Sequence, residues 1–326
     1  MFNKLRKEIN YKLINWQMKK GHSVLLGKPF SLVLDTCSFC NLECVWCPTG
    51  QKRNTRTKCI MSYEKVIKIF KKLGPYLKKV MLCNWGEPFL NKDLIREIMF
   101  IQKHYDLQLI LSTNLNTTFS EEQASSLVNS DLDVLICSID GIRQDTYETY
   151  RRKGNLSIAL ENLKLITKAK KENNTKKPLV IWQYLVFKHN EHELREAEKL
   201  AKEIGVDKIK FTKPWCPQDW TSTLPQYTNY QINGDSCKKE YKLLTKQCYC
   251  LWTTIVINAN GSVSPCCSVE DEKDDFGNFF DQSLFSLWNN KNYRIAREYN
   301  ISKQKGALNN ICTICDHIGT CPHPCN

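Results

Sequence analysis

Short runs rich in β-branched and aromatic residues alternate with longer helical patterns from residue 31 to about residue 213. Parallel strands need a crossover connection, which is usually a helix, so this alternation predicts repeated βα units around a parallel sheet. The first helix is expected to follow Ser62 and to end at Gly74. Six strands are expected, over residues 30–35, 79–84, 107–113, 133–140, 178–187 and 207–212. The pattern therefore predicts an α/β fold.

The chain divides into four parts by composition: an extension over 1–29, the βα units over 30–213, a bridging region over 214–247 and a cysteine-rich tail over 248–326. No apolar run is long enough to span a membrane, and the N-terminus lacks the apolar block of a secretory signal. We therefore expect a cytoplasmic protein.

The residue pattern of the N-terminal extension predicts an amphipathic helix. Leu5, Ile9, Leu13 and Trp16 recur at near-helical spacing between basic residues, and we expect this helix to pack against the body. A basic amphipathic helix can also lie on a membrane surface, so that alternative stays open.

Seventeen cysteines in a reducing compartment favour metal binding over disulfides, and the odd count argues against complete pairing. The net charge of +13 comes largely from lysines scattered along helix-like stretches, a pattern typical of solvated helix faces. Charge alone therefore predicts no nucleic-acid partner.

Three cysteines follow the first predicted strand directly. Cys40, Cys44 and Cys47 have C-x3-C-x2-C spacing, which brings three thiolates together on one loop. Thiolates suit zinc and iron–sulfur clusters, and a structural zinc site would need a fourth ligand, for which Cys37 is a candidate. On a four-iron cluster, three thiolates would leave one iron open to an exogenous ligand. The loop also lies where parallel βα architectures hold their active sites.

Residues 40–47, Cys-Asn-Leu-Glu-Cys-Val-Trp-Cys, resemble the signature of the radical S-adenosylmethionine (SAM) superfamily. The resemblance implies a partial (β/α)6 TIM-like barrel in which Cys40, Cys44 and Cys47 hold a [4Fe–4S] cluster. It also implies that the amino and carboxylate groups of SAM chelate the open iron and that Trp46 contacts adenine. Cys37 would then be an extra thiol that binds no iron.

Motifs after later strands extend this resemblance. Gly86, Glu87 and Pro88 follow the second strand and resemble the family segment that receives the SAM amino group, with Trp85 in place of a glycine. Asn114 belongs to a segment, 112–114, that resembles the family's Thr-Asn-Gly, with Leu115 in place of the glycine. The fourth strand ends in Ser138-Ile139-Asp140-Gly141, and Arg151 follows. In the resembling subgroup, this serine reaches the ribose or carboxylate, and the arginine pairs with the carboxylate.

The tail carries a second set of cysteines. Taken alone they would suit a zinc module, but behind a radical SAM barrel they resemble the SPASM or twitch extension, which binds auxiliary [4Fe–4S] clusters. The preferred assignment is one auxiliary cluster on Cys250, Cys266, Cys312 and Cys315. In the alternative, Cys312, Cys315 and Cys321 hold a second cluster, and Cys325 joins Cys250 and Cys266, with Cys248 or Cys267 as further candidates.

The resemblance implies an enzyme that cleaves SAM reductively to a 5′-deoxyadenosyl radical and removes a hydrogen atom from a substrate. The auxiliary cluster would handle an electron, and a reduced flavodoxin or ferredoxin would supply the first one. Only about thirty residues precede the first strand, too few for a separate peptide-recognition domain, which favours a saccharide or other small-molecule substrate. A peptide- or protein-modifying maturase is the alternative, and a zinc-dependent nucleic-acid-binding module is the alternative from another class.

Overall fold

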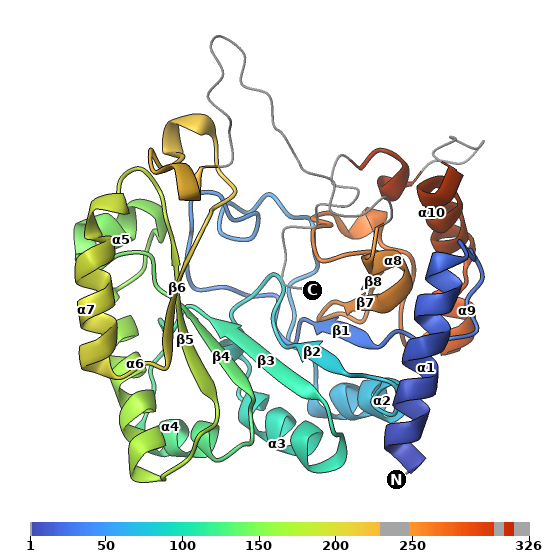
Figure 1. Ribbon diagram of the computed structural model, residues 1–326, viewed down its shortest axis with the longest axis horizontal. Coiled ribbons are helices and arrows are strands. Elements are labelled where there is room, and N and C mark those ends of the chain that lie inside the picture. The colour runs from blue at the N-terminus through green and yellow to red at the C-terminus, as the bar shows by residue number, and fades with distance from the viewer. Residues whose placement is uncertain (1, 229–247, 303–309, 316–326) are drawn as a thin grey trace.

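The computed structural model describes residues 2–228, 248–302 and 310–315 (Figure 1). In this part of the chain, eight strands form one sheet in the order β6-β5-β4-β3-β2-β1-β7-β8. The α/β fold and the six expected strands are confirmed, and because β6 and β8 form separate edges, the sheet is an open, partial barrel. The strands are β1 (Ser31–Leu34), β2 (Lys79–Met81), β3 (Gln108–Thr113), β4 (Val134–Ser138), β5 (Leu179–Leu185), β6 (Lys208–Thr212), β7 (Thr254–Ile257) and β8 (Val263–Ser264).

Neighbouring strands from β1 to β6 pair in parallel, so their carboxyl ends meet at one edge of the sheet. The helix after β1 begins at Tyr63, next to Ser62, and ends at Leu73, next to Gly74, as expected. The helices are α1 (Phe2–Lys19), α2 (Tyr63–Leu73), α3 (Leu94–His104), α4 (Glu121–Val128), α5 (Gln144–Tyr150), α6 (Leu156–Glu172), α7 (Leu194–Ile204), α8 (Cys250–Thr253), α9 (Leu284–Trp288) and α10 (Lys291–Ser302).

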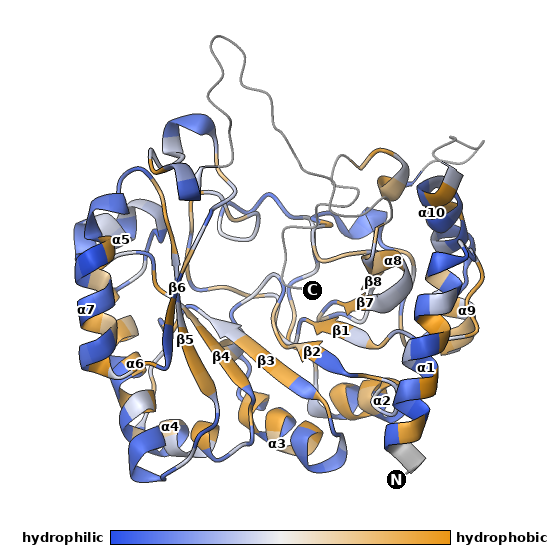
Figure 2. Cartoon of the chain, in the orientation of Figure 1, coloured by the Kyte–Doolittle hydropathy of each residue, from blue (hydrophilic) through white to orange (hydrophobic). Residues whose placement is uncertain are grey.

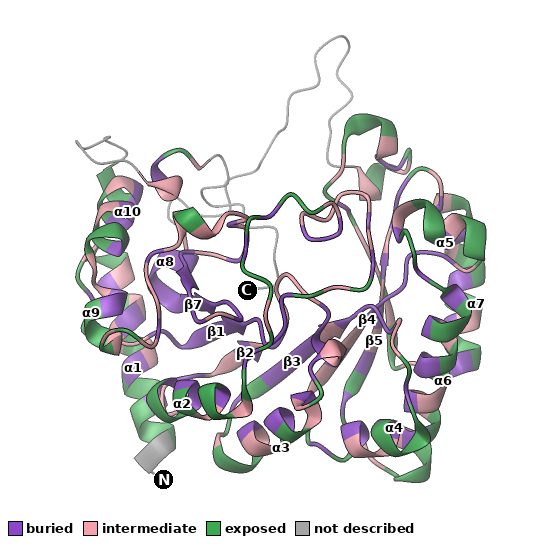
Figure 3. Ribbon diagram, turned by 180° about the vertical axis from the view of Figure 1, so that it is seen from behind, coloured by how far each residue is buried: buried purple, intermediate pink, exposed green. Residues whose placement is uncertain are grey.

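Alternation along the strands gives the sheet two different faces. One face carries large apolar side chains that belong to the main core with the helices. The strands contain many hydrophobic residues (Figure 2) and many buried ones (Figure 3). Its members on β1, β3 and β5 are Leu32, Leu34, Leu109, Leu111, Val180, Trp182 and Tyr184. The intervening residues line a cavity, described below, so the same strands stabilise the core and expose chemistry on the opposite face.

The C-terminal elements continue this sheet. β7 pairs in parallel with β1, with Leu32 opposite Ile255, and β8 turns back antiparallel to β7. The cysteine-rich region is therefore hydrogen-bonded to the edge of the first strand, directly beside the loop that carries Cys40, Cys44 and Cys47.

The N-terminal helix packs against the body, but with the face opposite to the one that its apolar stripe predicts. Ile14 and Gln17 are buried, whereas Leu5, Ile9 and Trp16 are 58%, 58% and 51% exposed. The expected packing against the body is confirmed, whereas amphipathic spacing alone does not say which side of the helix the body covers. None of the described helices is long and apolar enough to cross a membrane.

Candidate functional site

The loop after β1 carries the cysteine trio. It is held against the end of α5, because the backbone N–H groups of Glu43 and Val45 donate to the carbonyl oxygens of Arg152 and Tyr150, both at 3.0 Å. The chain also folds back tightly at Gly50, where a Cβ atom would lie 2.6 Å from the Cys44 nitrogen. These contacts fix the loop at the carboxyl edge of the strands.

The chemistry of the donor set fits an iron–sulfur cluster. Burial raises the pKa of Cys40 to about 11 and that of Cys44 to about 12, and the cation of Arg151 opposes the rise at both thiols. Three thiolates on one loop suit such a cluster, because each thiolate can bind a different iron.

Glu87 joins the loop after β2 to the end of β3. Its carboxylate accepts hydrogen bonds from the Thr113 hydroxyl (2.7 Å), the Asn114 backbone N–H (2.7 Å) and the Phe89 backbone N–H (3.1 Å). Burial raises its pKa despite these donors. A carboxylate offers about four acceptor positions, so Glu87 retains capacity for one further donor.

Gly86 and Pro88 shape the same turn. A Cβ atom on Gly86 would lie 1.8 Å from the Cys37 carbonyl oxygen, so no other residue fits without movement of the backbone. Pro88 starts the short 3-10 helix η1 (Pro88–Leu90), where its missing N–H costs nothing. The turn therefore lies in direct contact with the segment that leads into the cysteine loop.

Asn114 lies between the third strand and the cysteine loop. Its amide nitrogen is 3.8 Å from the Cys40 sulfur and donates to the Asn41 side-chain oxygen at 3.0 Å. Leu115, at the position where the resembling family has glycine, adopts φ +55°. The left-handed turn is thus kept although the residue is not glycine.

Arg151 is buried and pairs with Asp140 after β4, where its Nε donates to Asp140 Oδ2 at 2.7 Å. Burial alone would lower the pKa of Arg151, but the negative charge of Asp140 raises it well above its usual value. The guanidinium is therefore a permanent cation close to the cysteine trio.

Ser138 and Trp46 come from opposite sides of the site. Ser138 ends β4 and shares the cavity side of that strand with Ile136. Trp46 packs edge-on against Trp220 with ring centroids 5.4 Å apart, and its buried indole nitrogen has no hydrogen-bond partner in the described chain.

Asp35 is a buried acid beside the β2 turn that the sequence interpretation did not single out. Its Oδ1 accepts from the backbone N–H groups of Asn84 (3.3 Å) and Gly86 (3.5 Å), while Oδ2 is buried without a partner among the described residues. Burial raises its pKa to about 6, against the effect of these hydrogen bonds. The available signal was a lone acid at the end of an apolar strand.

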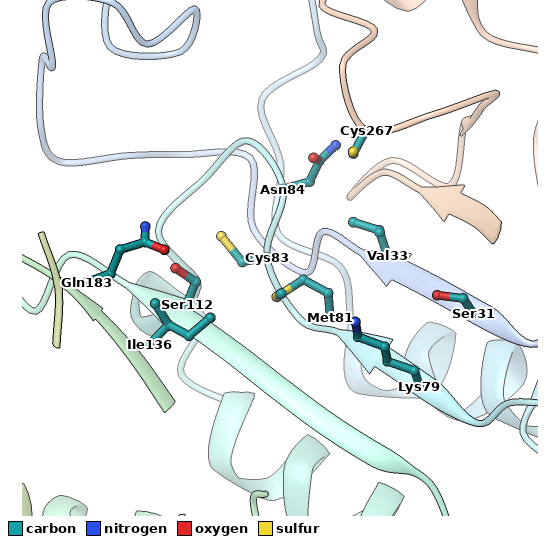
Figure 4. A pocket seen from close by; sticks show the side chains of 10 residues that line it. All are labelled: Ser31, Val33, Lys79, Met81, Cys83, Asn84, Ser112, Ile136, Gln183 and Cys267. Carbon is teal, nitrogen blue, oxygen red and sulfur yellow. The ribbon is translucent and has the colours of Figure 1, made fainter. Parts of the chain in front are cut away.

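A cavity of about 210 Å³ lies on the face of the sheet opposite the main core (Figure 4). Its lining is half polar, with Ser31, Lys79, Asn84, Ser112 and Gln183 beside Val33, Met81, Cys83, Ile136 and Cys267. Asp35 follows Ser31 and Val33 at every second position of the chain. Its backbone N–H donates to the Ile257 carbonyl oxygen at 2.9 Å, so the β1–β7 ladder continues to Asp35. Because side chains alternate along a strand, its side chain is directed to the same face as those of Ser31 and Val33.

The auxiliary cysteines meet at the other side of this cavity. Burial raises the pKa of Cys312 well above its usual value, and the neighbouring thiols of Cys266, Cys248 and Cys315 add to the rise. Cys250 packs in a small apolar cluster with Val33, Val256 and Cys267, and Cys248 and Cys266 pack against the same cluster. The structure thus brings both Cys248 and Cys250 close to Cys266, while Cys321 and Cys325 lie outside the described residues.

The cysteine-rich region also contacts the turn after β2. With its amide oriented for hydrogen bonding, Asn84 donates to the Cys267 carbonyl oxygen at 3.2 Å and accepts from Trp85 Nε1 at 2.8 Å. The cavity is therefore bounded by the β2 turn on one side and by the auxiliary cysteine region on the other.

Two family models match the chain. Residues 35–201 match the radical SAM superfamily, and residues 248–316 match an iron–sulfur cluster-binding domain, SPASM. These matches agree with both cysteine regions and do not support the zinc-dependent nucleic-acid-binding module.

Among curated proteins, a tungsten-containing aldehyde ferredoxin oxidoreductase cofactor-modifying protein of Pyrococcus furiosus is 24% identical, over 89% of this chain and 88% of its own. A GTP 3′,8-cyclase of Petrotoga mobilis is 33% identical over 38% of this chain, and the match spans only 39% of the cyclase.

Two solved structures share the fold. Streptococcus suis SuiB bound to S-adenosylmethionine has a TM-score of 0.64 at 14% identity, covering 89% of this chain and 72% of its own. The protein anSMEcpe with bound AdoMet has a TM-score of 0.59 at 18% identity, covering 81% of this chain and 78% of its own.

Proposed function

This chain belongs to the radical SAM superfamily and has a SPASM iron–sulfur domain, and from that premise we propose that it removes a hydrogen atom from a small polar substrate held in the sheet cavity. When bound, the [4Fe–4S] cluster and SAM supply the 5′-deoxyadenosyl radical for this step. The observation that carries the proposal is the half-polar cavity between the β2 turn and the auxiliary cysteine region.

The size and lining of the cavity favour a saccharide or another small molecule. Its volume of about 210 Å³ is below the roughly 300–1,000 Å³ typical of sites for drug-sized ligands. Hydroxyl, amide and ammonium groups from several strands can hydrogen-bond a polyhydroxylated molecule, and the apolar residues between them can exclude water. A peptide substrate would have to place a single side chain there.

In this proposal, different residues would bind the different polar groups of SAM. Cys40, Cys44 and Cys47 would hold the cluster, and Trp46 would contact adenine. Gly86, Glu87 and Pro88 would receive the amino group, for which Glu87 has one acceptor position left. Asn114 and Ser138 would border the cofactor, and the terminal nitrogens of Arg151 would pair with its carboxylate, since Asp140 takes only the Nε.

The auxiliary cluster would be bound by Cys248, Cys266, Cys312 and Cys315. Because Cys267 lines the cavity, a cluster on Cys266 would lie one residue away from the substrate space, a position suited to accept an electron from it. The reductant would be a small acidic flavodoxin or ferredoxin, for which the net charge of +13 provides attraction.

The test is anaerobic reconstitution followed by addition of dithionite and SAM. We expect 5′-deoxyadenosine from the wild type and none from Cys44→Ala, while Cys59→Ala, outside the trio, retains it. Deuterium transfer into 5′-deoxyadenosine from labelled candidates then identifies the substrate. No 5′-deoxyadenosine from the reconstituted wild type would overturn the proposed activity, and transfer from peptides but from no saccharide or small molecule would overturn the substrate class.

A further inference from the structure

Helix α1 presents an apolar stripe to solvent and packs a side of mixed polarity against the protein. The buried side carries Lys7, Asn10, Ile14 and Gln17, each 6% exposed or less. The outward side carries Leu5, Ile9 and Trp16, which are 58%, 58% and 51% exposed. Apolar side chains at such spacing are normally the ones that a helix buries, so this orientation requires a specific cause.

Hydrogen bonds to the body hold the helix in this orientation. Asn10 forms two with the backbone of Lys28, at 2.8 and 2.9 Å, and the Gln17 side-chain oxygen accepts from the Gly27 backbone N–H at 3.0 Å. The Lys7 ammonium donates to the Asp106 carbonyl oxygen. Rotating the helix to bury its stripe would leave these groups unpaired, at a cost of about 1–3 kcal/mol for each one left buried.

The apolar surface continues beyond the helix. Val24 and Leu26, on the segment after α1, are 43% and 67% exposed, and Phe285 on α9 is 46% exposed. Leu5, Ile9, Leu13 and Leu26 line a groove of about 450 Å³, with Arg6 and Lys28 among its other lining residues. We call the set of Leu5, Ile9, Trp16, Val24, Leu26 and Phe285 the α1 patch.

Positive charge surrounds the α1 patch. Exposed cations flank the helix stripe, and Lys28 lies 4.9 Å above the Phe285 ring. The only acid among residues 2–20, Glu8, is paired with Lys78 at 2.6 Å. The flanking cations are Lys4, Arg6 and Lys12, which are exposed, and Lys28, which is half-buried. Any binding partner must therefore present an apolar layer together with negative charge.

We propose that the α1 patch docks this protein on the surface of an anionic phospholipid bilayer. The apolar side chains would enter the boundary between headgroups and acyl chains, and the flanking lysines and arginine would contact the phosphates. Trp16 suits this boundary because its ring is apolar and its N–H is polar. A protein partner fits less well, since α1 has already used its buried polar groups on the body and leaves a narrow strip with few hydrogen-bonding groups.

Vesicle co-sedimentation of the full chain tests the proposal. We expect binding to vesicles of phosphatidylglycerol mixed with phosphatidylcholine, less binding as salt is added, and little binding to phosphatidylcholine alone. Leu5→Ser with Ile9→Ser should reduce partitioning by about tenfold or more. Arg6→Gln with Lys28→Gln should reduce it about fivefold for each lost charge.

The matched control is Ile158→Ser, which removes an exposed isoleucine from α6 and should bind like the wild type. The substituted side chains are exposed, apart from the half-buried Lys28, so circular dichroism should show an unchanged fold. The proposal is overturned if the wild type stays in the supernatant at low salt, or if the Leu5→Ser, Ile9→Ser variant binds like the wild type. A dimer that this variant dissociates, without vesicle binding, would assign the patch to a second copy instead.

Discussion

Burying the charged carboxylate of Asp35 costs electrostatic free energy, and the fold does not need a charged side chain at this position. Its backbone contacts to Asn84 and Gly86 could be made by a neutral side chain of the same shape, yet the charged form is buried with one oxygen unpartnered among the described residues. Residues retained against stability are commonly those that function needs. A carboxyl on the cavity face is such a residue, since it can accept a hydrogen bond or a proton from substrate.

Replacing Asp35 with asparagine should make the protein more stable at neutral pH. An acid with a raised folded pKa favours the folded state below its unfolded pKa of about 4, and this contribution is lost as pH rises through about 6. The gain of Asp35→Asn in unfolding free energy should therefore grow by about 3 kcal/mol between roughly pH 3 and pH 7. Urea unfolding of the metal-free protein measures it, and parallel pH curves for the two proteins would contradict it.

At the level of single residues, the sequence predicted the site residues that belong to short motifs and missed those that stand outside any motif. Glu87 was found because Gly86 and Pro88 flank it. Asp35 looked like the polar end of an apolar strand, and its importance depends on the unpartnered oxygen, which is a property of the packed structure. The spacing of residues in a sequence does not indicate that a carboxylate oxygen will be buried without a partner.

The orientation of helix α1 can be tested at the level of the element. Ile14 is fully buried and Leu5 is 58% exposed, because the two residues lie on opposite sides of the helix. Ile14→Ala should lower the free energy of unfolding by about 2–5 kcal/mol, whereas Leu5→Ala should change it by about 0.5 kcal/mol or less. Equal losses in urea unfolding would mean that the stripe is buried after all. The sequence could not decide this, because the polar contacts of Asn10 and Gln17 set the orientation.

Cys248 and Cys250 lie on the segment that leads into β7, and either could be the fourth ligand of the auxiliary cluster. Cys250 is separated from Gly261 by ten residues and Cys248 by twelve, so spacing alone could not distinguish them. In the folded chain, both thiols pack in the same small cluster with Val33, and Cys248 is the one that adds to the rise in the pKa of Cys312.

We expect Cys248→Ser to remove the auxiliary cluster and Cys250→Ser to keep it. Both changes are made in a background where Cys40, Cys44 and Cys47 are alanine, so that the remaining iron reports on the auxiliary site alone. Reconstituted Cys248→Ser should lose about four irons per chain and the associated visible absorbance. Loss in Cys250→Ser with retention in Cys248→Ser would restore the assignment made from sequence.

For the whole molecule, the sequence predicted the two cysteine regions but not how they are joined. β7 extends the sheet next to β1, and Arg56, from the segment after the cysteine loop, reaches into the C-terminal elements. Its guanidinium donates to both oxygens of Asp275, at 2.9 and 3.1 Å, and also to Ser264 and Val269. Contacts between residues more than 200 positions apart have no local pattern, so they could not be predicted.

The Arg56–Asp275 pair should hold the two cysteine regions at a fixed separation. Both side chains are nearly inaccessible, at 3% and 5% exposed, so Asp275→Asn leaves a buried cation without its counter-charge. We expect a loss of about 3–5 kcal/mol in unfolding free energy, and partial recovery in the double variant Arg56→Met, Asp275→Leu, which removes both charges. Lys273→Gln, which breaks an exposed pair with Asp271 at 3.8 Å, is the matched control and should cost less than about 1 kcal/mol. A similar small loss for Asp275→Asn would show that the sheet pairing between β1 and β7 is sufficient to join the two regions.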